Sequence, residues 1–353
     1  MRPIQPSSID SDRRTHSAVG APTSERDYAV AGRVLRVATS GDLAQQLSAA
    51  FMQSCCFPAA ESVAPEAETA IRVRSDSGAP VVPDSASIVP TPPGRWRITA
   101  TERFFELSDS IVRVRPSGRP PVDVWIGTSR QARRRLSLAH VMAHAVHAAL
   151  RRSGLYSFHG AGLACPQRSA GLLVAGGSGA GKSTLTLRLA QSGWRYLGDD
   201  SLLLYDTPSG VTVCGLRRPF AVREATVATL AWPRLNESLK ARVPDDPDKR
   251  WVYPEDLFPG QAAPSMRPAI LLFPELTGEP CSRLSDVRPA DALLRLVRTR
   301  LWADGHDDPE ARGCLRVLGQ LARQVRSYRL MAGRDLLESP GCAADLLGPV
   351  LES

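Results

Sequence analysis

Residues 171–190 read GLLVAGGSGAGKSTLTLRLA, which is a short apolar run, a glycine-rich loop and the start of an amphipathic helix. The loop, residues 176–184, satisfies the pattern G-x-x-x-x-G-K-[ST] and stands between a strand and a helix, as that pattern requires. Glycines adopt backbone angles that are closed to other residues and leave no Cβ between the backbone and a phosphate. Consecutive N–H groups and the helix N-terminus then favour an anion. The stretch therefore predicts a phosphate cradle in an α/β domain.

The positions of this loop predict a nucleoside triphosphate as the ligand. Lys182 is expected to reach the β- and γ-phosphates, and Ser183 to offer its hydroxyl to Mg²⁺. Only three of the 44 basic residues of the chain are Lys, so composition alone does not explain a Lys at this place. ATP and Mg²⁺ are the expected cofactors. The predicted nucleotide-binding residues are Gly176, Gly177, Ser178, Gly179, Ala180, Gly181, Lys182, Ser183 and Thr184.

An acidic pair, Asp199-Asp200, follows the loop. The helix is expected to end at Ser192-Gly193, and one short strand then returns beside the phosphate-loop strand and carries both carboxylates to the ligand-binding edge of the sheet. One carboxylate can hold Mg²⁺ or its water, and the other can accept a proton from an attacking hydroxyl. The alternative is a plain Asp-Asp turn before a strand at 201–205.

A histidine upstream, His159, precedes Gly160. The strand that begins at Gly171 would be the second half of a hairpin or crossover from this point. His159 could therefore neighbour the acidic pair and tune its proton affinity. A single histidine can equally have a structural role.

These three elements together resemble the C-terminal catalytic domain of HPr kinase/phosphorylase. More closely, they resemble a broad group of HPr-kinase-related proteins with a Gly-Trp-Arg-Tyr-Leu-x-Asp-Asp stretch after the loop, matched here by residues 193–200. That group includes kinases of peptide natural-product pathways, such as those of lasso peptides. The resemblance is good over roughly residues 155–205. It extends weakly to about 335, through Pro219, Lys249 and Pro274.

The resemblance implies an α/β P-loop kinase domain of the HPr kinase/phosphoenolpyruvate carboxykinase type, which phosphorylates a serine hydroxyl with ATP. Carried over to this sequence, Asp199 would be the base that faces the acceptor, and Asp200 would position Mg²⁺ or the base. The resemblance therefore implies Ser183 and Asp200 as the metal ligands. His159 would lie beside Asp199. The assignment between the two aspartates stays open.

The sequence departs from that family after the acidic pair. Residues 215–224 read GLRRPFAVRE and lack the family's signature of a metal-binding Glu followed by Arg-Gly, although Glu224 is a candidate ligand. Reverse phosphorolysis and recognition of HPr are therefore left open. Four basic residues are candidates for contacts with phosphate or substrate: Arg217, Arg218, Lys249 and Arg250. Exposed arginine without a ligand is the alternative in a chain with 41 Arg, and we expect the segment 244–259 to be mobile.

The composition limits the class of protein. The chain has 353 residues, 43% of them hydrophobic, and a net charge of +8. It has no 18-residue apolar run, and its first residues do not form the apolar core of a secretory signal, so a cytoplasmic protein is expected. The basic residues are scattered among 36 acidic ones, which makes nucleic acid a weak candidate partner beside a serine-containing polypeptide. The chain could also form a homo-oligomer.

The domain organisation is read from periodicity. Residues 1–26 are expected to be a disordered tail, 27–151 a smaller α+β accessory domain, and 152–353 the P-loop domain with a helical end. In the accessory domain we expect a strand at 28–37, a helix from Asp42, a small antiparallel sheet within 96–126 and a helix over 129–152. We also expect helices at 289–302 and 310–328. His140, His144 and His147 share one face of the 129–152 helix, as a metal face or as a polar stripe beside the core.

The sequence as a whole predicts an ATP-dependent serine kinase for a protein or peptide, such as a natural-product precursor peptide. Two alternatives remain. One is a kinase or ATPase that acts on a small hydroxylated metabolite. The other is a non-catalytic regulatory module in which ATP only switches the conformation.

Overall fold

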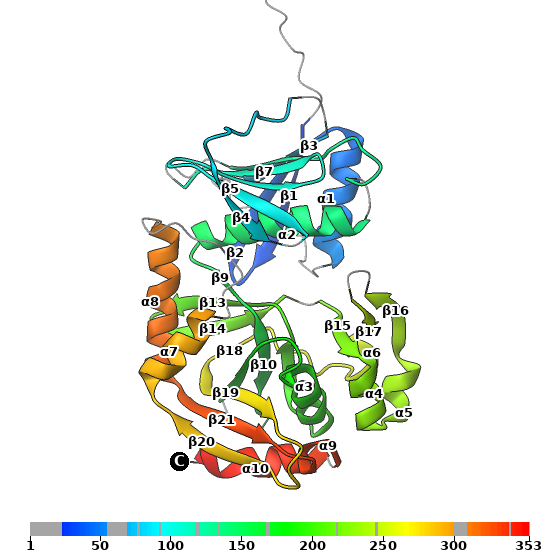
Figure 1. The fold of residues 1–353 in the computed structure, drawn as a ribbon, viewed down its shortest axis with the longest axis vertical. Coiled ribbons are helices and arrows are strands. Elements are labelled where there is room, and N and C mark those ends of the chain that lie inside the picture. Colours follow the sequence, from blue (N-terminus) through cyan, green and yellow to red (C-terminus); the bar gives the residue numbers. More distant parts are fainter. Residues whose placement is uncertain are drawn as a thin grey trace, which may run out of the picture.

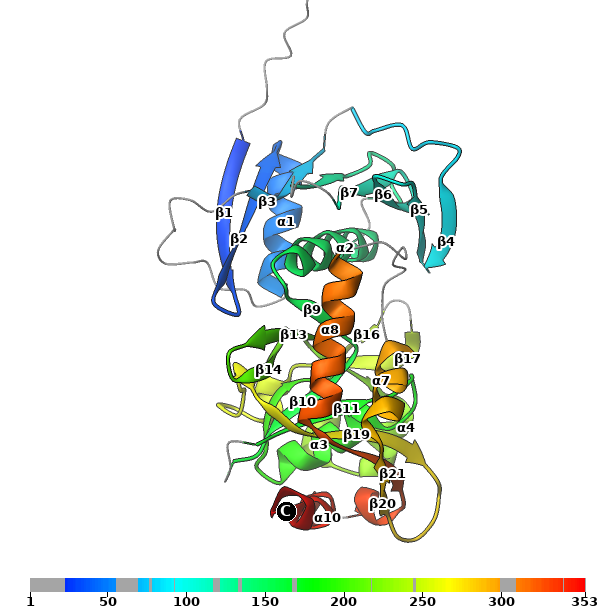
Figure 2. The ribbon, with the colours of Figure 1, turned by 90° about the vertical axis from the view of Figure 1, so that its left-hand side faces the viewer.

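The computed structural model describes residues 23–54, 69–75, 78–91, 93–116, 121–132, 135–166, 170–216, 218–243, 246–298, 309–338 and 340–352. These residues form four β-sheets with helices between and around them (Figures 1 and 2). In this part of the chain, no helix is both long enough and apolar enough to cross a membrane.

The N-terminal region is an eight-stranded sheet with two helices on one face. The strand order is β1-β2-β3-β8-β7-β6-β5-β4. The strands are β1 (Thr23–Val30), β2 (Arg33–Ser40), β3 (Thr69–Arg74), β4 (Ser87–Thr91), β5 (Gly94–Ile98), β6 (Arg103–Leu107), β7 (Ser110–Val114) and β8 (Val122–Trp125). Helices α1 (Asp42–Ser54) and α2 (Arg135–Arg152) pack against the apolar face of this sheet. Figure 1 shows α2 between the sheet and the rest of the chain.

Several predictions for this region were wrong in detail. The strand expected at 28–37 is two strands, because Ala31 (φ 49°) and Gly32 (φ 73°) both take positive φ and turn the chain back on itself. Residues 23–26 lie in β1, while residues 1–22 lie outside the described ones. The sheet is larger than predicted and mixed, since β2, β3 and β8 run parallel.

The phosphate-loop strand lies in a six-stranded sheet of order β12-β10-β11-β19-β21-β20. The strands are β10 (Gly160–Ala164), β11 (Gly171–Ala175), β12 (Arg195–Gly198), β19 (Pro268–Leu276), β20 (Arg283–Val287) and β21 (Arg326–Ala332). Strands β11, β19 and β21 are parallel to one another. Residues 326–328, predicted as the end of a helix, belong to β21 instead, because a continuous run of alternating buried residues pairs there with β19.

Alternation along the sheet gives it two apolar faces. Leu172 and Val174 face one side, with α3 (Lys182–Gln191), α9 (Asp335–Glu338) and α10 (Pro340–Glu352). Leu173 and Ala175 face the other side, with α7 (Pro289–Arg298) and α8 (Pro309–Gln324). A strand buried on both faces has this near-continuous apolar sequence. The predicted strand, loop and helix around residues 171–190 are thereby confirmed.

Two smaller sheets complete the C-terminal part. One has the order β18-β14-β13-β9 and contains β9 (Tyr156–Phe158), β13 (Leu202–Thr207), β14 (Gly210–Gly215) and β18 (Ser265–Met266). The other, which we call the lid sheet, has the order β15-β17-β16 and contains β15 (Phe220–Arg223), β16 (Leu239–Val243) and β17 (Asp246–Val252). Three short helices accompany it: α4 (Glu224–Leu230), α5 (Pro233–Glu237) and α6 (Pro254–Leu257). The described part of the segment 244–259, which we expected to be mobile, contains β17 and α6.

Two of the three histidines of α2, His144 and His147, pack within the N-terminal region, and His140 is half buried. The His144 ring packs against Trp96 and Phe105, at centroid distances of 5.5 and 3.7 Å. His147 Nδ1 is hydrogen-bonded to the Ser157 hydroxyl on β9. Among the described residues, no group of three or more His, Cys, Asp or Glu side chains could hold a metal ion. The packing matches the polar-stripe interpretation.

Burial of these histidines makes stability depend on pH. Burial, followed by the charges of His147 and His140, lowers the pKa of His144 to about 3. Burial, followed by Arg218 and Arg151, lowers the pKa of His147 to about 4. The unfolded chain therefore binds protons near pH 6.5 while the folded chain does not, and stability falls as pH falls from there toward 4.

We expect the free energy of unfolding in urea to decrease by up to about 1.4 kcal/mol per pH unit per histidine between about pH 6.5 and about pH 4. A His144→Gln variant should show a shallower dependence, because it has one buried imidazole fewer. An equal slope for the variant and the wild type would contradict this account.

Candidate functional site

The glycine-rich loop runs from the end of β11 at Ala175 to the start of α3 at Lys182. Gly179 (φ 83°) and Gly181 (φ 93°) take left-handed angles that side chains disfavour. A Cβ at Gly177 or Gly179 would meet no atom within 4 Å, so this side of the loop is open. The first N–H groups of α3 adjoin the opening, and a helix N-terminus favours an anion there. The geometry is that of a phosphate cradle.

Lys182 lies folded over the loop. Its Nζ donates to the backbone oxygens of Gly176 (2.8 Å) and Gly177 (3.0 Å), and the residue is buried. Burial lowers the pKa of Lys182, and the negative charges of Asp200 and Asp199 partly offset this. The ammonium is therefore held within the loop by neutral carbonyl groups.

Strand pairing explains why three distant segments meet at this loop. β10 is antiparallel to both β11 and β12, with Gly160 opposite Ala175 and Gly162 opposite Gly198. The start of β10 therefore adjoins the ends of its two neighbours. The residue before β10 is His159, the residue after β11 is Gly176, and the residue after β12 is Asp199.

This pairing confirms one prediction and corrects another. The hairpin between the segment after His159 and the loop strand is present as β10–β11. The strand that carries the acidic pair, however, lies beside β10 and not beside the phosphate-loop strand β11. Both arrangements bring the acidic pair to the same edge, since β12 and β11 point in the same direction.

Close contacts between backbones fix this geometry. A Cβ at Gly160 would lie 2.6 Å from the Val174 oxygen, and one at Gly215 would lie 1.9 Å from the Leu197 oxygen. Gly215 thus lets β14 approach the strand that ends at the acidic pair. Only glycine fits either position without a shift of the backbone.

The two aspartates are in different environments. Asp199 is 5% exposed, and its Oδ2 accepts a 2.8 Å hydrogen bond from the Ser183 hydroxyl. Burial, followed by the charge of Asp200, raises the pKa of Asp199 to about 7. Asp200 is half exposed, and its Oδ1 lies 2.7 Å from His159 Nδ1.

Burial alone would raise the pKa of Asp200 as well. The hydrogen bond and charge of His159 outweigh it, with smaller contributions from Arg218 and Lys182, so the pKa of Asp200 is lowered. Neighbouring carboxyl groups with pKa values moved apart can take different roles in acid–base chemistry.

These contacts differ from the predicted pairings. Ser183 lies against Asp199, whereas we had grouped Ser183 with Asp200 as metal ligands. His159 pairs with Asp200, whereas the resemblance put it beside Asp199. The bulge in the β10–β12 pairing between Gly162 and Leu163 shifts the register at this edge, which residue order alone does not reveal.

A pocket of about 360 Å³ lies over the loop. Ten of the predicted residues line it: His159, Ser178, Gly179, Gly181, Lys182, Ser183, Thr184, Asp199, Asp200 and Lys249. Six further residues, which we had not predicted, complete the lining: Ala221, Arg223, Ala225, Thr226, Thr229 and Leu276.

Arg223 is the main functional candidate that the sequence reasoning missed. It ends β15 opposite Lys249 of β17, and its Nη2 donates to the Ser178 hydroxyl of the loop (3.2 Å). Asp246 Oδ2 lies 3.7 Å from Arg223 Nη2 and 3.1 Å from Lys249 Nζ. The lid sheet therefore presents two cations to the pocket, held by one carboxylate. In a chain so rich in arginine, nothing local distinguished Arg223.

The other basic candidates lie elsewhere. Arg250 is not part of the pocket lining, and its Nε donates to the Lys240 oxygen. Neighbours along a strand point to opposite faces, so β17 directs Lys249 and Arg250 apart. Arg218 is half buried outside the lining, near enough to lower the pKa of Asp200. Arg217 lies outside the described residues.

The remaining predicted positions border the pocket or face away from it. The loop residues Gly176, Gly177 and Ala180 are not part of the lining. Glu224 is half exposed and pairs with Arg242 of the lid sheet (3.2 Å), also outside the lining.

The oxygen groups of the pocket fit Mg²⁺. The hydroxyl of Ser183 and the carboxylates of Asp199 and Asp200 are hard oxygen ligands in one place. Mg²⁺ usually binds through one or two carboxylates together with water and substrate phosphates, rather than through a complete protein cage. This set of donors is of that kind.

No protein-family model and no curated protein matches the chain. Among solved structures, the HPr(Ser) kinase/phosphatase from Coxiella burnetii is similar at 11% identity and a TM-score of 0.29, over 56% of this chain and 96% of that one. Both values are too low for the likeness to support a function. The conclusions below rest on the residues of the pocket.

A pair of glycine variants tests the backbone geometry. We expect Gly215→Ala to lower the free energy of unfolding by about 3 kcal/mol or more, because its Cβ would overlap the Leu197 oxygen. Gly177→Ala should change stability little, because its Cβ would enter open space. Urea denaturation measures both. Equal stability of the two variants would contradict the close approach of β14 to β12.

Proposed function

We propose that this chain is an ATP-dependent phosphotransferase that transfers the γ-phosphoryl group to a serine hydroxyl of a protein or peptide, such as a natural-product precursor. The observation that carries the proposal is the meeting of a phosphate loop, a paired aspartate and histidine, and a second buried aspartate in one pocket. A structural strand-to-helix turn would need none of these carboxylates.

The loop and the lid sheet would hold the triphosphate from two sides. Loop N–H groups and Lys182 would bind the β- and γ-phosphates, for which Lys182 exchanges its two carbonyl partners. Arg223 and Lys249 would face the same phosphates from the lid sheet. Guanidinium and ammonium groups suit phosphate oxygens in a partly buried site.

Mg²⁺, when bound with the nucleotide, neutralises phosphate charge as the transition state forms. Ser183 and one of the two aspartates would hold it. Asp200, kept ionised by His159, is suited to a cation. Ser183 would then leave its hydrogen bond with Asp199.

Asp199 is suited to act on the acceptor. Its carboxylate would take the proton of the serine hydroxyl as the serine oxygen bonds to the γ-phosphorus and the bond from that phosphorus to the ADP oxygen breaks. A carboxyl group with a pKa near 7 can accept and return a proton at neutral pH. The products are a phosphoserine and ADP.

The direct test is phosphate transfer from ATP with Mg²⁺ to a pool of serine-containing peptides, read by mass spectrometry. We expect a phosphopeptide with the wild type and none above background with Lys182→Ala, since the loop loses its charge. Asp199→Asn should keep ATP binding in a calorimeter and lose transfer by about a hundredfold or more, the usual range for loss of a general base.

Other outcomes identify the alternatives. Lys182-dependent release of phosphate without a phosphopeptide, or transfer to a small hydroxylated compound, would indicate an ATPase or metabolite kinase. Tight ATP binding without turnover would indicate a regulatory module. Loss of ATP binding by Asp199→Asn would make Asp199 a metal ligand instead of the base.

Arg223 and Arg250 form a matched pair for the role of the lid sheet. Both arginines belong to this sheet, but only Arg223 lines the pocket. We expect Arg223→Gln to lower ATP turnover by about tenfold or more, the effect of losing one charge-assisted contact. Arg250→Gln should keep turnover within about twofold. Equal losses in the two variants would argue that charge in general, rather than this contact, supports the activity.

A further inference from the structure

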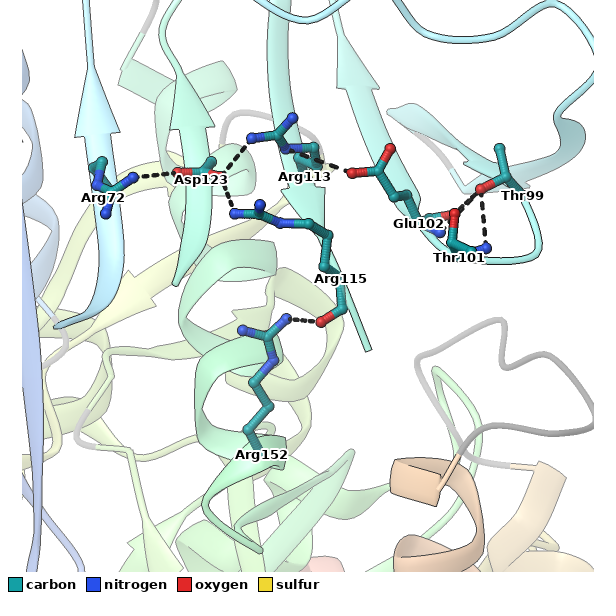
Figure 3. Close-up of polar contacts among 8 residues, drawn as sticks. All are labelled: Arg72, Thr99, Thr101, Glu102, Arg113, Arg115, Asp123 and Arg152. Atoms are coloured by element: carbon teal, nitrogen blue, oxygen red, sulfur yellow. Dashed lines mark hydrogen bonds and ion pairs between the residues drawn. The ribbon is translucent and has the colours of Figure 1, made fainter. Parts of the chain in front are cut away.

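The face of the eight-stranded sheet that α1 and α2 leave uncovered carries a group of arginines. Because side chains alternate along strands, Arg72 and Arg74 of β3 lie on the face opposite to Ile71 and Val73, which are in the core. Asp123 of β8 stands between Arg72 and Arg113 in the register of the sheet. Figure 3 shows Arg72, Asp123 and Arg113 side by side on three neighbouring strands. We call Arg72, Arg74, Arg113 and Arg115 the Arg face.

One buried carboxylate organises this group. Asp123 is 1% exposed, and its oxygens lie 2.7 Å from Arg115 Nη2, 2.8 Å from Arg113 Nη2 and 3.5 Å from Arg72 Nη1 (Figure 3). The three guanidinium groups keep 38% (Arg72), 24% (Arg113) and 32% (Arg115) of their side-chain surface exposed. Each therefore has a fixed position and retains contact with solvent.

The positive charge exceeds what the acids on this face neutralise. Besides Asp123, Glu102 lies 3.9 Å from Arg113 Nε. Arg74 stacks over the Trp125 ring (5.9 Å), and Arg113 stacks over the same ring (5.0 Å). Among the described residues, these four guanidinium groups contact two carboxylates, those of Asp123 and Glu102. Each guanidinium group has five N–H donors, and Asp123 accepts from only a few of those on Arg72, Arg113 and Arg115, which leaves donors for another acceptor.

Two further arginines, Arg151 and Arg152 of α2, lie near Arg115 at the end of the sheet. Arg152 of α2 donates to the Arg115 oxygen (2.9 Å), as Figure 3 shows, and Arg151 and Arg152 share Glu310 of α8 at 3.6 and 3.5 Å. Burial lowers the pKa of Arg152; the charge of Glu310 opposes this shift, and the weaker effect of the Arg115 charge adds to it. The Arg face is therefore a site where an incoming anion would reduce repulsion among fixed cations.

The side chains favour carboxylates over nucleic acid. Planar guanidinium groups bind carboxylates through paired hydrogen bonds. Single-stranded nucleic acid instead binds where exposed aromatic rings stack on its bases. Trp125 is 5% and Phe104 is 1% exposed, so the aromatic rings of this face lie beneath the arginines.

We propose that the Arg face binds an acidic segment of a polypeptide, whose carboxylates are held by Arg72, Arg74 and their neighbours on β7. Only one part of this inference rests on the proposed function, namely that the bound polypeptide is also the phosphate acceptor. The sheet would then retain the substrate while a serine elsewhere in it reaches the pocket.

The test is fluorescence anisotropy of the full-length protein without nucleotide. The probe is a labelled peptide of alternating Glu and Gly, and a peptide of alternating Gln and Gly is its control. We expect the Glu peptide to bind more tightly than the Gln peptide and its affinity to fall with added salt. The Arg72→Gln/Arg74→Gln variant should bind it about tenfold more weakly, the loss expected for two partly exposed ion pairs.

The control variant removes the same two positive charges from a different surface, that of α8. Arg312→Gln/Arg323→Gln removes two exposed arginines from α8 and should bind the peptide as the wild type does. Lys182→Ala should also bind it normally. If the double Arg72/Arg74 variant does not fold, Arg74→Gln alone should weaken binding by about threefold, because within the described part of the chain Arg74 contacts the Trp125 ring rather than a carboxylate.

Three results would overturn the proposal. One is equal binding by the Arg72/Arg74 and Arg312/Arg323 variants. Another is loss of binding in Lys182→Ala, which would put the peptide in the phosphate pocket. The last is tighter binding of a single-stranded oligonucleotide, lost in the Arg72/Arg74 variant, which would make the partner a nucleic acid. Because no ATP is present, these results are independent of whether phosphate transfer occurs.

Discussion

The antiparallel pairing of β10 with β11 on one side and β12 on the other is the constraint on which the site depends. It places the start of one strand next to the ends of two others, and each of these three chain ends carries a functional group. The phosphate loop, the acidic pair and His159 are far apart in sequence and meet because of this one arrangement. Gly160 and Gly215 make it sterically feasible, since a Cβ at either place would enter a neighbouring backbone.

The charged side chains of the pocket have partners that offset the free-energy cost of removing them from water. Three cations and two carboxylates share a partly buried space, where unpaired charge is costly. Each has a partner: Lys182 has two carbonyl groups, Asp200 has His159, and Arg223 and Lys249 share Asp246. Asp199 is the one carboxylate of the pocket whose hydrogen-bond partner, Ser183, is neutral, and burial together with the charge of Asp200 raises its pKa to about 7. Nucleotide binding would exchange these internal partners for phosphate oxygens, which is why the same side chains can be stable without a ligand and available to one.

The sequence was sufficient for the centre of the site and insufficient for its surroundings. The loop could be predicted because binding a phosphate requires glycines and a lysine at fixed positions along a short segment. The acidic pair could be predicted because only one short strand separates it from the helix that follows the loop. The partner of each aspartate could not be predicted, because the register between β10 and β12 is interrupted by a bulge at Leu197 that the sequence does not reveal. Arg223 could not be found, since its role comes from pairing with Lys249 across a sheet whose strands are 26 residues apart at that point. The first three residues of β21 were predicted as the end of a helix, because an arginine-rich amphipathic stretch fits both periods until its neighbour β19 is known.

The N-terminal sheet is continuous with the part of the chain that holds the pocket. Its main hydrophobic cluster includes Leu203 of β13 and both Cys214 and Leu216 at the end of β14. The same strand β14 contributes Gly215, which sets the position of β12 and so of the acidic pair. Helix α2 joins the two through His147 and Ser157, and Arg151 and Arg152 tie it to α8. The eight-stranded sheet therefore shares its hydrophobic core with the strands next to Asp199 and Asp200, so the proposed polypeptide site and the proposed site of phosphate transfer would be parts of one packed structure.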